Sequence, residues 1–296
     1  MHDLRTRGEK AFAAFNYLFM AALCLVCVYP LWYVLVSSVS DPVQLYARRG
    51  VMWWPLMPAS LRGYRLVIEN PNIPIGFGNT MIYLGVGTLA NMLITIMGAY
   101  GLSRKGLYWN VKIMKMIAFT MYFQGGLIPF YLMVTNMGWK DTYAAIIVPV
   151  LVNTWNLIVL RTAFAGVPDS LEESARLDGA GDWTILWRIF FPLTQATIAV
   201  ITLFYGVYWW NNWFNPSIFL SSKSKYPIQL VLREILLKND TSAMTQVGTV
   251  GQSQQEQFRM LVKYCTIIVA TVPILALYPF LQRYFVKGVM IGSIKG

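Results

Sequence analysis

The chain has 296 residues, of which 56% are hydrophobic and only 12% charged, whereas a soluble domain carries about 25% charged residues. Its mean hydropathy is +0.50 and its formal net charge is +11. Because apolar runs of about 18 residues or more recur along it, the composition excludes an ordinary soluble globular protein. It predicts an all-α, polytopic membrane protein instead.

Six segments are long and apolar enough to cross the membrane as helices. A helix rises about 1.5 Å per residue, so each segment can span a hydrocarbon core of about 30 Å. The first segment is too long for the apolar region of a cleaved signal peptide, which favours an uncleaved anchor. The predicted spans, in chain order, are residues 12–36, 78–101, 113–135, 142–160, 193–215 and 264–282.

The short loops decide the predicted orientation, because basic residues divide almost evenly between the two sides. Positive charge in short segments beside spans favours the cytoplasm. This places both termini and the loop 165–192 inside, and the loop 216–260 outside. The external segments are basic overall, which suits either an acidic solute or anionic lipid headgroups. The deciding basic residues are Arg5, Arg7 and Lys10 before the first span, and Arg104, Lys105, Lys112 and Lys115 after the second.

Ionisable residues are almost missing from the predicted spans, with Lys115 near the start of the third range. Proton-coupled transporters place a protonatable relay at membrane depth, and membrane enzymes need a nucleophile with a base or a metal cluster. His2 is the only histidine, and no G-x-x-x-x-G-K-[ST] phosphate loop occurs. We therefore predict no catalytic residue and no metal site, and we expect a partner to supply the energy.

A polar island at residues 172–192 interrupts the apolar chain. Ser170-x-x-Glu173 has the spacing of a capping box, which predicts a short helix. Gly179 and Gly181 are expected to end that helix, and Asp182 to cap the next one. On these grounds alone, the island is equally well interpreted as a solvated amphipathic loop or as a contact surface for another protein.

The spacing within this island resembles a family signature. Glu173-Ser174-Ala175-(x3)-Gly179-(x9)-Ile189-x-Phe191-Pro192 is similar to the EAA-x3-G-x9-I-x-L-P pattern of bacterial ABC importer permeases, with Ser for the first Ala and Phe for Leu. Asp178-Gly179-Ala180 is the variant typical of carbohydrate importers. The segments 124–129, 209–213 and 226–230 look like the same family. Within it, the chain resembles the smaller maltose permease subunit, and especially the branch for complex or acidic oligosaccharides that includes the alginate importer.

This resemblance implies a single permease domain over 1–296 with six transmembrane helices, the type I ABC importer fold, in the bacterial cytoplasmic membrane. It implies that the loop 165–192 couples the permease to its ATPase. The implied partners are a second permease subunit, two ATP-binding cassette ATPase subunits, an extracytoplasmic solute-binding protein and the lipid bilayer, but no nucleic acid. ATP and Mg would bind to the ATPase, and no cofactor to this chain. The implied coupling residues are Glu172, Glu173, Ser174, Ala175, Asp178 and Gly179.

Uncharged polar and aromatic residues at membrane depth are candidates for the solute pathway. Aromatic rings stack on sugars and amides hydrogen-bond to their hydroxyls. The same residue types also join helices or form interfacial belts, so both interpretations stay open. The alternative function is a stand-alone facilitator or sodium-coupled carrier, which would not purify with an ATPase. The pathway candidates are Gln124, Asn153, Asn156, Tyr205, Trp209, Asn211, Asn212 and Trp213.

Overall fold

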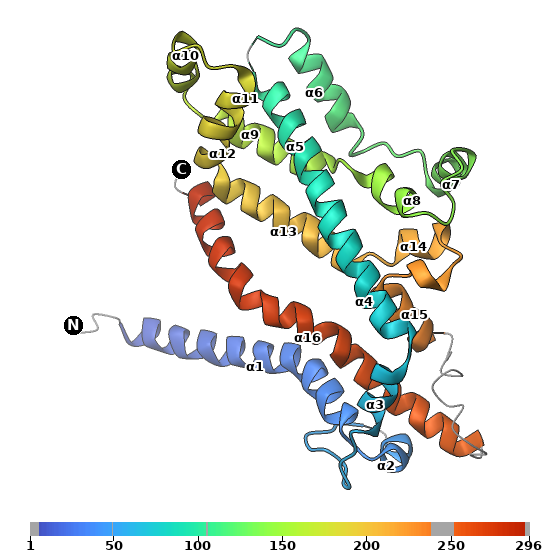
Figure 1. Ribbon diagram of the computed structural model, residues 1–296. Helices are drawn as coiled ribbons and strands as arrows, with labels where there is room; N and C mark the ends of the chain where they lie inside the picture. Colours follow the sequence, from blue (N-terminus) through green and yellow to red (C-terminus); the bar gives the residue numbers. More distant parts are fainter. Residues whose placement is uncertain (1–5, 49, 105, 238–251, 294–296) are drawn as a thin grey trace. The chain divides into compact units, whose positions relative to one another are not determined.

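The computed structural model describes residues 6–48, 50–104, 106–237 and 252–293, and these residues form helices without any strand (Figure 1). The all-α prediction is therefore confirmed. The chain divides into two compact units: residues 1–70 with 234–273, and residues 71–233 with 274–296. Each unit is described by itself below.

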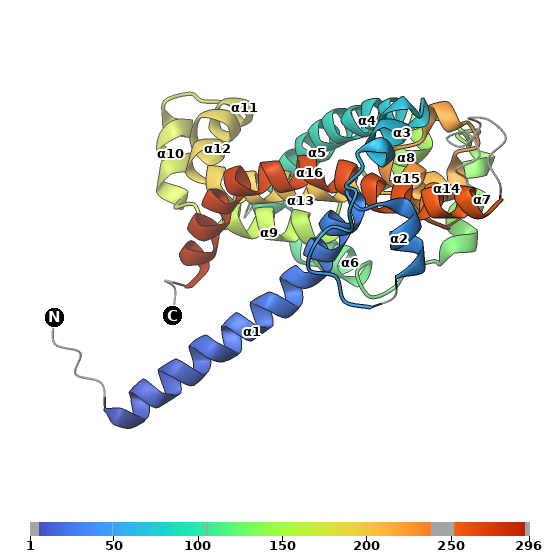
Figure 2. The ribbon, with the colours of Figure 1, turned by 90° about the horizontal axis from the view of Figure 1, so that it is seen from below.

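The first unit begins with a long apolar helix, α1. Thr6 and Glu9 close a capping box at its N-terminus, in which Thr6 Oγ1 accepts a hydrogen bond from Glu9 N at 3.3 Å. Nearly all of its apolar side chains are exposed, as suits a helix whose surroundings are lipid or another membrane subunit. Figure 2 shows the N-terminal part of α1 running away from α2 and α3 of the same unit. The helices of this unit are α1 (Arg7–Ser38), α2 (Pro42–Ala47), α3 (Arg62–Glu69) and the first part of α16 (Gln252–Ser293).

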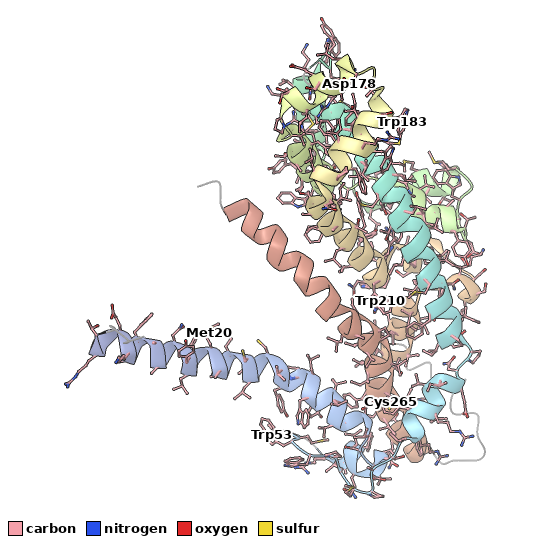
Figure 3. The ribbon with its side chains drawn as sticks, turned by 60° about the vertical axis from the view of Figure 1, so that its left-hand side comes forward. Met20, Trp53, Asp178, Trp183, Trp210 and Cys265 are labelled. Carbon is pink, nitrogen blue, oxygen red and sulfur yellow. The ribbon has the colours of Figure 1, made fainter. Side chains whose placement is uncertain are left out.

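The core of this unit lies where α3 and α16 meet the C-terminal end of α1. Cys265 Sγ, labelled in Figure 3, donates a hydrogen bond to Ser38 O at 3.2 Å. Ser38 Oγ also shares a hydrogen bond with Tyr64 Oη at 2.6 Å. A Cβ added to Gly63 would lie 2.6 Å from Cys265 Sγ, so α3 approaches α16 too closely for any side chain there.

The second unit holds the remaining helices. Its hydrophobic core lies mainly between α5, α9 and α13, with a second cluster around Tyr83, Trp209 and Phe219. Its elements are α4 (Asn72–Ile82), the π-helical turn η1 (Tyr83–Gly87), α5 (Thr88–Ser103), α6 (Asn110–Phe119), α7 (Leu127–Asn136), α8 (Tyr143–Ile147), the 3₁₀ turn η2 (Val148–Val150), α9 (Thr154–Ala165), α10 (Asp169–Leu177), α11 (Asp182–Ile185), the π-helical turn η3 (Leu186–Phe190), α12 (Phe191–Leu193), α13 (Gln195–Asn211), α14 (Phe214–Phe219), the 3₁₀ turn η4 (Lys223–Lys225) and most of α15 (Ile228–Leu237).

The second predicted span is one continuous helix over residues 72–103, formed by α4, η1 and α5. Trp209 packs against the wide π-helical turn, and a Cβ on Gly87 would lie 2.3 Å from Trp209 Cε2. The Trp209 ring also stacks with Tyr83 at a centroid distance of 6.3 Å. The glycine in η1 therefore lets α13 approach this helix closely.

The third and fourth predicted spans are each broken, whereas the sequence suggested continuous helices. Residues 113–135 form α6 and α7 with non-helical chain between them, where Gly126 has φ = +84°. Residues 142–160 form α8 and α9, which bend by 45° around a break at 151–153. Pro149 cannot donate the helical N–H hydrogen bond, and Asn153 starts a new helix by capping α9.

The predicted number of six spans is not confirmed. Among the described residues, three helices are long and apolar enough to cross a membrane, or up to five if each bent pair forms one span. The fifth predicted span, 193–215, is mainly α13, which runs from Gln195 to Asn211 between the end of α12 and the start of α14. The segment 182–193 meets α13 at an angle of 86°. The sixth, 264–282, lies within the longer helix α16.

The predicted external loop, 216–260, is more ordered than its polar composition suggests. Its part from Ile228 to Leu237 is the amphipathic helix α15, whose Ile228 N donates a hydrogen bond to Thr80 Oγ1 at 2.9 Å. A Cβ on Gly76 would lie 3.1 Å from Ile228 Cα, so α15 packs directly on α4. Residues 238–251 of this loop lie outside the described part of the chain.

Candidate functional site

The polar island folds into a short helix followed by a tight reversal. α10 begins at Asp169, directly after Pro168, and ends at Leu177. Gly179 has φ = +81°, and its N–H donates to Arg176 O at 3.0 Å. Ala180 N donates to Ala175 O at 2.9 Å, which completes the Schellman ending of the helix. The predicted helix and its glycine stop are therefore confirmed.

Both predicted N-terminal caps of the island are wrong. Pro168 occupies the cap position of α10, so Ser170 lies inside the first turn and cannot close a capping box with Glu173. Gly181 is the N-cap of α11, and Asp182 is the first residue of that helix rather than its cap. Proline and glycine take these positions because their backbone conformations suit the chain entering each helix.

α10 leaves most of its surface exposed. It contains no buried residue, and only Ala175, with Ala180 just beyond it, packs against the core cluster of α5, α9 and α13. Leu177 is 89% exposed, although leucine favours burial. α10 and α11 lie at one end of the second unit, where Figure 3 labels Asp178 and Trp183. The exposed side chains of α10 are therefore accessible to another protein.

Glu172 and Glu173 lie in different environments. Glu172 is 16% exposed and accepts hydrogen bonds from Arg104 and, at 3.0 Å, from Arg176 Nη2. Arg176 also bonds Asp182 Oδ1 at 2.6 Å, and these two carboxylates raise the pKa of Arg176. Glu173 is exposed, and no hydrogen bond or ion pair reaches its side chain within the described part of the chain. Glu172 is thus used inside the chain, whereas Glu173 is available to a partner.

The two buried aromatic candidates of the pathway set hydrogen-bond to other parts of the chain. Trp209 is fully buried, and its Nε1 donates to Asn91 Oδ1 at 2.8 Å. Tyr205 is also buried, and its Oη shares a hydrogen bond with Thr95 Oγ1 at 2.8 Å and accepts one from Asn153 N at 3.1 Å. Both side chains therefore join α13 to neighbouring segments of the chain. This favours their interpretation as helix-joining residues.

The remaining candidates differ in exposure. Asn156 and Asn212 are buried, and Asn212 Nδ2 has no hydrogen-bond partner among the described residues. Gln124, Asn153 and Asn211 are exposed, as is Trp213, whose ring lies 4.3 Å from the Arg233 guanidinium carbon. Asn153 also caps α9 by accepting from Asn156 N at 3.1 Å.

The two breaks in the helices lie side by side. Thr120 Oγ1, at the end of α6, is 3.3 Å from Thr154 Oγ1, at the start of α9. Thr120 precedes the non-helical segment that contains Gln124, and Asn153 directly precedes Thr154. Non-helical backbone at membrane depth persists only where protein covers it or water reaches it.

Sequence reasoning missed two residues that organise this unit. Asn91 donates from Nδ2 to Val150 O and Leu151 O at 2.7 and 2.8 Å, which satisfies carbonyls freed by the break before α9. Arg104 enters the sequence argument only as a positive charge that sets orientation, yet its guanidinium pairs with Glu172. An amide within the second span could have been recognised as a helix-joining group, but its partners are carbonyls of a break that the sequence did not reveal.

Metal-ligating side chains do not gather at one place in the described residues: no group of three or more His, Cys, Asp or Glu side chains is arranged to hold a metal ion. Cys24 and Cys27 are both free thiols on exposed positions of α1.

A family model described as "Binding-protein-dependent transport system inner membrane component" matches residues 6–291. The chain is 34% identical to Protein LplC of Bacillus subtilis over 298 residues, with 100% of this chain and 98% of LplC covered. It is 35% identical to the polygalacturonan/rhamnogalacturonan transport system permease protein YtcP of the same species, with 97% and 99% covered.

A solved structure matches the fold closely. It is the crystal structure of a bacterial ABC transporter involved in the import of the acidic polysaccharide alginate. The matched chain has a TM-score of 0.86 and 26% sequence identity, with 96% of this chain and 100% of that chain covered.

Proposed function

Since this chain belongs to the family of binding-protein-dependent transport system inner membrane components, we propose that it serves an ATP-driven importer of acidic oligosaccharides. It is a sugar permease of the ABC importer class and has the type I permease fold. The finer proposal concerns the charge of the solute. YtcP is named for polygalacturonan and rhamnogalacturonan, and the matched structure for alginate. All three polymers contain uronic acid, so a shared carboxylate is the feature that supports an acidic solute.

The family assigns the chain to a membrane complex in which a second permease, an ATPase and a solute-binding protein take part. We propose one partner permease and two ATPase subunits, with both termini of this chain in the cytoplasm. Under this arrangement the ATP and Mg belong to the ATPase, and this chain performs no chemical step. Closure of the ATPase dimer would then move α10 and switch the access of the pathway by a rigid-body motion.

The proposed ATPase contact is the exposed side of α10. Glu173, Ser174 and Asp178 are exposed there, and Leu177 offers an apolar contact beside them. Glu173 is the residue best placed to pair with a basic group of the ATPase, because its carboxylate has no other use in the described chain. Gly179 reverses the chain after α10, which leaves the C-terminal end of this helix exposed.

The proposed solute contacts are Gln124 and Asn153, which lie in the two adjacent helix breaks. Their exposed amides can donate to and accept from sugar hydroxyls. Asn211 and Trp213 at the end of α13 are further exposed candidates, whereas the burial of Tyr205 and Trp209 leaves them no open surface in this chain.

The contact of α10 with the ATPase is tested by Glu173→Lys. A lysine facing a basic group repels it, and each 1.4 kcal/mol of lost binding lowers the affinity about tenfold. We expect the variant permease to fold, but the ATPase that purifies with it to fall about tenfold or more and ATP hydrolysis to be uncoupled from uptake. The measurement is affinity purification of the tagged permease with its subunits, followed by uptake into vesicles.

Glu69→Lys is the matched control, since Glu69 is an exposed glutamate of α3 outside the island. This variant should retain the ATPase at the wild-type level. Wild-type uptake by Glu173→Lys would contradict the proposed contact.

A further inference from the structure

α10 is held to the rest of its unit by few contacts. It is nine residues long, it buries none of them, and a single small side chain, Ala175, packs on the core. Isolated helices of this length are unstable in water. A helix that transmits force needs a firm attachment, and apolar packing supplies little of it here. The attachment therefore depends on the polar contacts of α10.

Arg104 provides such an attachment from another element. It is the residue directly after α5, and its Nη1 donates to Glu172 Oε2 of α10. Its Nε and Nη2 donate to Ser103 Oγ at 3.1 and 2.8 Å, which fixes the plane of the guanidinium. An arginine held this way loses little further freedom when it binds a carboxylate.

The same guanidinium contacts two aromatic rings. Its central carbon is 4.1 Å from the ring centroid of Phe190 in η3 and 4.9 Å from that of Tyr100 in α5. Both rings belong to the core cluster, and they pack edge to face on each other at 5.4 Å. Cation–π contacts strengthen when the cation is withdrawn from water. Arg104 therefore joins the end of α5, the turn η3 and α10 in one place.

Burial separates this ion pair from an ordinary surface pair. The side chains of Arg104 and Glu172 are 19% and 16% exposed, whereas Arg176, the other partner of Glu172, is 49% exposed. Exposed pairs contribute little because water and salt screen them, and a partly buried pair is screened less. Arg176 belongs to α10 and pairs with Glu172 of the same helix and with Asp182 of α11. It therefore does not link α10 to α5.

We propose that Arg104 is a positioning residue that fixes α10 to the end of α5 and to η3, so that a displacement of α10 moves these elements together. This inference rests on the proposed coupling role of α10. A contiguous set of packed and charged groups with a defined geometry is the kind of connection that carries coupling between distant sites.

The first test measures the attachment without any transport. A spin label is attached to the variant Leu177→Cys, because Leu177 is 89% exposed, in a chain whose exposed Cys24 and Cys27 are replaced by Ser. Arg104→Gln and Glu172→Gln should each increase the mobility of the label, and the double variant should add little to either. Arg176→Gln removes an arginine from the same carboxylate and should leave the mobility near that of the wild type. Unchanged mobility in Arg104→Gln would overturn the attachment.

The second test measures coupling in the complete transporter. We expect the solute taken up per ATP hydrolysed to fall about fivefold or more in Arg104→Gln and Glu172→Gln, in the range of usual coupling energies. Arg104→Lys keeps the charge but not the planar fork or its ring contacts. Its uptake per ATP hydrolysed should therefore lie between those of the wild type and Arg104→Gln. It also decides the outcome if Arg104→Gln does not assemble.

A wild-type ratio in Glu172→Gln and Arg104→Lys, despite a mobile label, would overturn the coupling role of Arg104 while leaving the proposed function intact. A wild-type transporter without ATP-dependent uptake would contradict the proposed function instead, and the spin-label result would still decide whether Arg104 holds α10.

Discussion

Adjacent carboxylates in α10 face different surroundings, which local sequence could not distinguish. Glu172 and Glu173 both lie in the predicted island, but the helical rotation of about 100° per residue turns one towards Arg104 and the other outward. The family signature includes Glu173, the exposed one. Glu172 resembles it in charge and position, and only the placement of α5 shows that Glu172 has a partner inside the chain.

Asp141 is a second carboxylate whose role depends on residues far along the chain. It has φ = +58°, which aspartate tolerates better than most residues. Its Oδ1 accepts from Ser221 N and Ser222 N at 3.0 Å each, and its Oδ2 accepts from Ser222 Oγ at 2.5 Å and from Lys225 Nζ at 3.2 Å. These bonds connect the loop after α7 to the loop after α14.

The hydrogen bond from the Ser222 hydroxyl, with those from the backbone N–H groups of Ser222 and Ser221, holds the pKa of Asp141 well below its usual range. A carboxyl whose pKa is lower when folded stabilises the protein above its unfolded pKa of about 3.9, and this contribution is lost as the pH falls further. We therefore expect Asp141→Asn to lower the melting temperature in detergent at pH 7. The difference from the wild type should shrink as the pH falls below about 4.

Glu69→Gln serves as the control, because the Glu69–Arg65 pair is exposed and such pairs contribute about 0–1 kcal/mol. It should melt close to the wild type at pH 7. A difference between Asp141→Asn and the wild type that stays constant down to pH 3 would show that the charge of Asp141 has no part in the stabilisation.

At the scale of elements, the sequence predicted where apolar helices lie better than where they break. Long apolar runs identified α1, the helix 72–103 and α16, because runs of such length and hydropathy are rare outside membrane-spanning helices. The break before Asn153 is stabilised by a contact with another helix. Asn91 supplies hydrogen bonds to the carbonyls of Val150 and Leu151, and only the fold shows that it does so.

The π-helical turn η1 gives a test of helix packing at this scale. Gly85 and Gly87 both lie in η1, but a Cβ on Gly85 would meet no atom within 4 Å, whereas one on Gly87 would overlap Trp209. We expect Gly87→Ala to destabilise the protein by about 1–3 kcal/mol, as overpacking does. Gly85→Ala should be neutral or slightly stabilising, because alanine favours helix.

Melting temperatures of the two variants in the same detergent measure this difference. Equal melting temperatures would mean that α13 does not approach η1 as closely as the structure shows.

At the scale of the whole molecule, the family signature identified the function more reliably than physical reasoning identified the pathway. The island's spacing was specific enough to indicate an importer permease, and the family match over residues 6–291 confirms it. The pathway candidates follow from residue type alone. Polar and aromatic side chains both join helices and bind sugars, so burial was needed to separate Tyr205 and Trp209 from the exposed amides.

The exposed apolar surface of α1 and of the shorter helices agrees with a subunit whose stability depends on lipid and on other membrane subunits. Because its family makes this chain one component of a binding-protein-dependent transport system, the energy source that we propose for uphill transport is a partner ATPase. This dependence distinguishes the importer from the stand-alone facilitator or sodium-coupled carrier.

The most direct test is uptake by the complete transporter in proteoliposomes, with the solute-binding protein outside and ATP enclosed. Trigalacturonate is compared with a neutral trisaccharide of the same length, so that the carboxylates are the main difference. We expect ATP-dependent accumulation of trigalacturonate and little of the neutral sugar. Accumulation without ATP, or of the neutral trisaccharide alone, would contradict the account.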